Sequence, residues 1–77
     1  MKKSEILGNL AHEYSICHSV YASMLKQAEM FLKKGDMAAW QRMTERTANR
    51  AATLHGIKRA ALALGITETE LLAAAGF

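Results

Sequence analysis

Apolar and small residues recur at regular intervals of three and four positions in the first half of the chain. The intervals run 3, 4, 3, 4, 3, 4, 3 through Leu7, Leu10, Tyr14, Cys17, Tyr21, Met24, Ala28 and Phe31. Side chains at this spacing lie along one side of an α-helix, so the run predicts a single helix of about 30 residues. The chain contains no proline that would break such a helix.

The residues after this run predict a tight connection to a second helix. Gly35 can adopt the left-handed conformation that ends many helices, and Asp36 is a good N-cap for the helix that follows. A connection this short makes two neighbouring helices antiparallel. We therefore expect helices over about residues 4–34 and 37–64, with Ser4 as the N-cap of the first.

The end of the chain predicts a short third helix over residues 68–75. Gly65 is placed to end the second helix, with Ile66 making the apolar contact that accompanies a Schellman ending. Thr67 and Glu70 then have the spacing of a capping box. The expected fold is all-α: one helical domain, residues 1–77, made of a long antiparallel hairpin and a short C-terminal helix.

The predicted hairpin has more apolar surface than it can cover by itself. A helix of about 30 residues is about 45 Å long, whereas a compact globule of this chain length is only about 30 Å across. The apolar stripe of the first helix is also broad, because Ala11, Leu25 and Leu32 widen it. We expect a homodimer that forms a four-helix bundle, although a helix of another protein could fill the same groove. The residues expected at this core or dimer seam are Leu10, Tyr14, Cys17, Tyr21, Met24, Phe31, Trp40, Leu54 and Ile57.

Positive charge is concentrated in the middle of the chain. The net charge is +3, and residues 33–59 carry seven Lys or Arg side chains against Asp36 and Glu45. Three arginines are spaced four apart on the second helix, so they share a face that could hold phosphates or an acidic protein surface. A solvated helix face, partly neutralised by Glu45, is the simpler alternative. The expected partner-binding residues are Arg42, Arg46, Arg50, Lys58 and Arg59.

The sequence shows no pattern typical of catalysis or metal binding. His12 and His18 are six residues apart and therefore lie on different helix faces, which does not suit a shared metal ion. Cys17 lies within the apolar seam, which favours a buried thiol in a reducing compartment over a nucleophile. We expect no enzyme activity, no metal, no cofactor and no small-molecule substrate. Without a signal or membrane-spanning segment, we expect a cytoplasmic protein with no membrane partner.

Two local strings resemble parts of known protein classes. The string Leu64-Gly65-Ile66-Thr67 followed by Glu70-Leu71-Leu72 is similar to the end of repressor-type DNA-binding domains. Its would-be recognition helix, residues 68–75, holds two acids and no base, so structural capping explains it better than DNA reading. The Lys34-Gly35-Asp36 join, with Trp40 and Met43 after it, is similar to the join of helical-hairpin secretion chaperones.

Two functions therefore remain open from the sequence. The first is a small protein–protein interaction module, such as an adaptor, chaperone or inhibitor of the compact kind that phages, mobile elements and secretion systems encode. The second is a small regulator that binds DNA or RNA through the basic face of the second helix. The second predicts binding that weakens steeply with salt.

Overall fold

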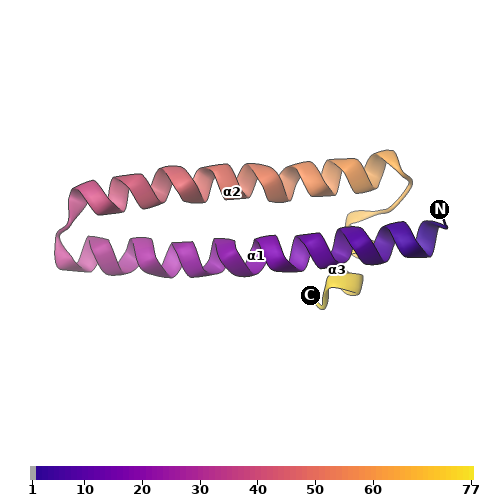
Figure 1. The fold of residues 1–77 in the computed structure, drawn as a ribbon, viewed down its shortest axis with the longest axis horizontal. Helices are drawn as coiled ribbons and strands as arrows, with labels where there is room; N and C mark the ends of the chain where they lie inside the picture. Colours follow the sequence, from indigo (N-terminus) through magenta and orange to yellow (C-terminus); the bar gives the residue numbers. More distant parts are fainter. Residues whose placement is uncertain (1) are drawn as a thin grey trace.

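The computed structural model describes residues 2–77 and contains three helices and no strand within that range. Helix α1 spans Lys3–Lys34, α2 spans Met37–Ala63 and α3 spans Glu68–Ala75. Helices α1 and α2 run side by side in opposite directions, and α3 folds back against α1 near the open end of this hairpin (Figure 1). The predicted all-α hairpin with a short C-terminal helix is confirmed. Met1, which the expected domain included, lies outside the described residues.

The connection between α1 and α2 forms as its residue types predict. Gly35 adopts a left-handed φ of 76°. Its N–H donates to the Leu32 carbonyl at 3.1 Å, and the Asp36 N–H donates to the Phe31 carbonyl at 3.0 Å, which is a Schellman ending. The Asp36 carboxylate then accepts a hydrogen bond from the Ala39 N–H at 3.1 Å and caps α2.

The expected N-cap of α1 is wrong by two residues. Ser4 lies inside the helix, and Lys2 occupies the N-cap position without a side-chain hydrogen bond. The Lys2 carbonyl accepts from the Glu5 and Ile6 N–H groups at 3.0 and 3.1 Å. These bonds extend the helix to the N-terminal side of Ser4. The first N–H groups of the helix lie at an exposed end, where water can accept their hydrogen bonds in place of a capping side chain.

The connection between α2 and α3 consists of a second Schellman ending followed by a capping box. Gly65 has a φ of 80°, and the Ile66 N–H donates to the Ala61 carbonyl at 2.9 Å. This geometry turns Ile66 into the core, where only 1% of its surface remains exposed. Thr67 then caps α3, because its hydroxyl accepts from the Glu70 N–H while the Glu70 carboxylate accepts from the Thr67 N–H.

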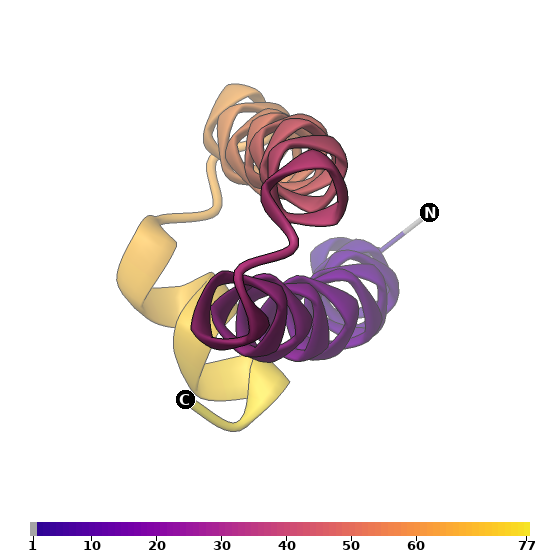
Figure 2. The ribbon, with the colours of Figure 1, turned by 90° about the vertical axis from the view of Figure 1, so that its left-hand side faces the viewer.

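The buried core lies at the open end of the hairpin, where all three helices meet. Leu71 of α3 is completely buried there. Figure 2 shows α3 to one side of the hairpin, against α1. The buried cluster consists of Ala11, Tyr14, Cys17, Leu54, Ala61, Ile66 and Leu71. Towards the α1–α2 loop the buried residues are smaller, namely Ala28, Ala39 and Thr47.

The molecule is a rod. Its extents are 49 × 20 × 17 Å and its radius of gyration is 15.0 Å. A compact domain of this chain length has a radius of gyration of about 11.5 Å. The extra length comes from the loop-end half of the hairpin, which α3 does not reach (Figure 1).

Candidate functional site

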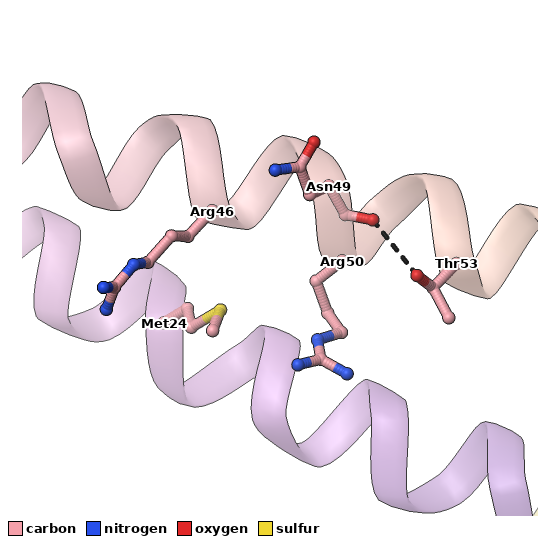
Figure 3. A pocket seen from close by; sticks show the side chains of 5 residues that line it. All are labelled: Met24, Arg46, Asn49, Arg50 and Thr53. Carbon is pink, nitrogen blue, oxygen red and sulfur yellow. Dashed lines mark hydrogen bonds between the residues drawn. The ribbon is translucent and has the colours of Figure 1, made fainter.

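Three arginines of α2 line one side of the hairpin, and we call Arg42, Arg46 and Arg50 the arginine face. They bound two adjacent shallow pockets that share Arg46. The first pocket, of about 400 Å³, is shown in Figure 3, where Arg46 and Arg50 reach from α2 towards α1 on either side of Met24. The second, of about 190 Å³, lies nearer the loop. It is lined by Phe31, Ala39, Arg42, Met43 and Arg46.

The arginine face combines unpaired charge with an apolar floor. Within residues 2–77, none of its three guanidinium groups forms an ion pair with a carboxylate. Met24, Phe31 and Met43, all half-buried, supply the apolar surface between them. Asn49 and Thr53 complete the larger pocket, and the Thr53 hydroxyl donates to the Asn49 carbonyl at 3.2 Å (Figure 3). An occupant with carboxylates and apolar groups would suit this surface.

Lys58 and Arg59, which the sequence grouped with these arginines, lie elsewhere on α2. The Lys58 ammonium pairs with the Glu68 carboxylate of α3 at 2.9 Å and lies 5.7 Å from the centre of the Tyr14 ring. This hydrogen bond to Glu68, together with the nearby Tyr14, raises the pKa of Lys58 above its usual 10.5. Arg59 follows Arg50 by nine residues, so its side chain points about 180° away around the helix.

A further hollow, which we call the loop-end groove, lies on the other side of the α1–α2 contact. Its volume is about 480 Å³. Met24 and Leu25 are neighbours in α1 and therefore point about 100° apart. Met24 lines the arginine face, whereas Leu25 lines the groove. The groove is lined by Tyr21, Leu25, Ala28, Glu29, Leu32, Trp40, Thr44, Thr47, Ala48 and Ala51.

The residues expected at the seam are buried or half-buried in the single chain. Tyr14, Cys17 and Leu54 are buried. The other six are half-buried: Leu10, Tyr21, Met24, Phe31, Trp40 and Ile57. The structure places Tyr21 and Trp40 in the loop-end groove, and Met24 and Phe31 at the arginine face. The nine residues thus lie on both sides of the hairpin.

Cys17 and His18 are neighbours in the sequence but have different surroundings in the structure. The Cys17 thiol is buried and lies 3.9 Å from the Arg50 carbonyl oxygen. His18 packs instead against Phe77, with ring centres 4.5 Å apart, and near Tyr14 and Tyr21. Within residues 2–77, no three His, Cys, Asp or Glu side chains are grouped as metal ligands would be. Sequence reasoning missed the contact of Phe77 with His18, because no periodic pattern links the last residue to α1.

No helix in the described range is both long enough and apolar enough to cross a bilayer.

Comparison with known protein families, with curated proteins and with solved structures gives no match to this chain.

Proposed function

We propose that this protein is a small protein–protein interaction module that acts by binding rather than by catalysis. Its arginine face would bind an acidic and partly apolar segment of another protein. Two features observed together support the proposal. The three guanidinium groups lack a carboxylate partner within residues 2–77. The side chains of Met24, Phe31 and Met43 form an apolar floor between them. An adaptor, a chaperone or an inhibitor would each work in this way.

The spacing of the arginines favours a helical partner segment. Arg42, Arg46 and Arg50 are four residues apart, which corresponds to a rise of about 6 Å between successive side chains. A partner helix lying along α2 with Asp or Glu at every fourth position would present carboxylates at the same interval. Arginine pairs well with such carboxylates because its planar group can donate two parallel hydrogen bonds.

The apolar floor favours a protein over a nucleic acid as the partner. A phosphate backbone offers nothing to the side chains of Met24, Phe31 and Met43, whereas an amphipathic helix would cover them. In addition, Lys58 already pairs with Glu68 on another side of the molecule. The basic groups free to bind one strand of phosphates are therefore fewer than the sequence suggested.

The test compares two charge reversals of equal size. Arg46→Glu changes the residue shared by both pockets, and Arg59→Glu is the matched control away from them. Each protein is used to capture partners from a lysate of the native host, and a captured protein is then purified and titrated calorimetrically. We expect an acidic protein whose affinity falls at least about tenfold with Arg46→Glu and little with Arg59→Glu.

Two results would overturn the proposal. The first is an affinity for the purified partner that Arg46→Glu leaves unchanged. The second is tight binding to duplex DNA with a steep salt dependence that Arg46→Glu abolishes, which would make the protein a nucleic-acid-binding regulator.

A further inference from the structure

The loop-end groove continues the surface that α3 covers on the hairpin. Tyr14 and Tyr21 are seven residues apart in α1 and thus on the same side. Tyr14 contacts Phe77 at the end of α3, with ring centres 5.8 Å apart, whereas Tyr21 lines the groove. On α2, Lys58 pairs with Glu68 of α3, and Ala51, seven residues earlier, lines the groove. One face of the hairpin is therefore covered by α3 at its open end and uncovered at its loop end.

The uncovered half is apolar and almost without charge. Leu25 and Leu32 are 45% and 49% exposed there. Glu29 is the one charged residue that lines the groove, and its carboxylate already lies 3.7 Å from the Lys33 ammonium. The Thr44 and Thr47 hydroxyls donate to carbonyls of their own helix, at 2.9 and 2.7 Å. A strongly charged occupant would thus find no counter-charge, and an apolar one would fit.

The chain as a whole exposes more surface than a compact monomer of its mass. The accessible surface of the chain is 5343 Å². A compact monomer of 8.5 kDa would expose about 4,700 Å², so this molecule exposes about 650 Å² more. A standard protein interface buries about 800 Å² on each partner. The excess of the whole rod is thus of the same order as the area that one such interface covers.

Both walls of the groove carry large apolar side chains as well as small ones. The α1 wall carries Leu25 and Leu32, and the α2 wall carries Trp40 near the loop and the small Ala48 and Ala51 further along. If a second copy were rotated by a two-fold axis perpendicular to the helices, so that only the loop-end halves overlap, each α1 would lie against the α1 of the other copy and each α2 against the other α2. A two-fold interface uses the same patch of both copies, and apolar side chains of facing helices interlock in helical bundles.

We propose that two copies of this chain pair through their loop-end grooves to form an antiparallel four-helix dimer. Helix α3 of each copy limits how far the two hairpins can overlap along their length, because it already covers the other half of the same face. The dimer would leave the arginine faces open, so it is independent of the proposed binding function and could present two such faces at once.

The experiment measures molar mass by analytical ultracentrifugation over a range of concentrations. Wild-type protein is expected to sediment at twice 8.5 kDa. Leu25→Lys places a charge in the groove and can pair with Glu29 one turn later, which keeps the helix intact. We expect it to weaken dimerisation at least about 100-fold, tenfold for each of the two copies. Leu32→Lys is an independent second variant, and circular dichroism checks that each variant is still helical.

Ile16→Lys is the matched control, because Ile16 is also on α1 and is 52% exposed but does not line the groove. It should dimerise like the wild type. A wild-type monomer at hundreds of micromolar would overturn the proposal. So would a dimer that Ile16→Lys disrupts and that Leu25→Lys and Leu32→Lys leave intact, since the interface would then be another face.

Discussion

At the scale of single residues, Thr67 and Glu70 form the most completely bonded polar pair described in the chain. The Glu70 carboxylate accepts from the Thr67 N–H at 3.3 Å and from the Thr67 hydroxyl at 3.1 Å, and it lies 3.7 Å from the Lys3 ammonium. The hydrogen bonds from Thr67 are the main reason why the pKa of Glu70 lies below its usual 4.5, and the nearby Lys3 lowers this pKa further. The pair therefore links the start of α3 to both the α2–α3 connection and α1.

We predict that Thr67→Ala lowers the free energy of unfolding by about 1 kcal/mol at neutral pH, as losing a helix N-cap does. Urea unfolding at pH 7 measures the change.

We also predict that the stability contributed by Glu70 depends on pH. Because the pKa of Glu70 is lower in the folded than in the unfolded chain, its ionised form stabilises the fold above pH 4.5. That stabilisation is lost as the pH falls through the folded-state pKa.

Urea unfolding of the wild type and of Glu70→Gln at several pH values tests this. The wild type should be the more stable protein at pH 7, and the difference should shrink below pH 4.5. A difference that stays constant down to acid pH would show that the carboxylate charge contributes nothing.

Single-residue contacts differ in how far the sequence could predict them. The Thr67–Glu70 pair was predictable because both partners lie within one helical turn. The pairing of Lys58 with Glu68 was not, because it depends on where α3 docks after the turn at Gly65. The sequence grouped Lys58 with the arginines of the same helix, whereas the structure pairs it with Glu68 of α3.

At the scale of elements, glycine has opposite roles within α2 and at its end. Gly56 lies inside α2, where glycine costs about 1 kcal/mol relative to alanine. Gly65 follows the helix with a left-handed φ of 80°, which costs side-chain-bearing residues about 1–2 kcal/mol. An added Cβ would meet no atom within 4 Å at either position. The two sites therefore differ in backbone conformation and not in available space.

We predict that Gly56→Ala raises the free energy of unfolding by about 0.5–1 kcal/mol and that Gly65→Ala lowers it by about 1 kcal/mol or more. Thermal unfolding followed by circular dichroism gives both values. Each variant serves as the control for the other, because both add the same methyl group. Destabilisation by Gly56→Ala would mean that α2 needs a bend at this position.

Helix ends were predictable where a glycine or a capping pair marks them. Gly35 and Gly65 end α1 and α2 through the hydrogen bonds that their flexible backbone permits. The start of α1 was not predictable to the residue, because Ser4 is a good cap by type but the helix continues past it to Lys3. An exposed helix end can be hydrated by water, so an available capping residue need not be used.

At the scale of the whole molecule, stabilising contacts are unevenly distributed along the hairpin. The open end holds the buried cluster that includes Tyr14, Leu54 and the fully buried Leu71. The loop end buries only small residues, Ala28, Ala39 and Thr47. Sequence periodicity predicted that the two helices pair along their length. It could not show that α3 folds back over one half, because the docking of α3 depends on Ile66, Leu71 and Phe77, which belong to no periodic run.

This unevenness predicts a gradient of amide hydrogen exchange in the monomer. Local opening costs least where the fewest apolar contacts are lost. We therefore expect amides of residues 10–20 and 54–62 to exchange at least about tenfold more slowly than those of residues 24–32 and 40–51. Dilute Leu25→Lys protein, which is expected to stay monomeric, is the suitable sample for this measurement by nuclear magnetic resonance.

The same measurement on concentrated wild-type protein connects the gradient to assembly. If two copies cover each other's loop-end grooves, the amides of residues 24–32 and 40–51 gain protection, because opening that half would also break the interface. Residues near Tyr14 and Leu71 should change less, since α3 already covers them. Equal protection along the dilute monomer would show that α1–α2 packing is uniformly strong despite the small buried residues at the loop end. The loop half would then be stable without a second copy to cover it.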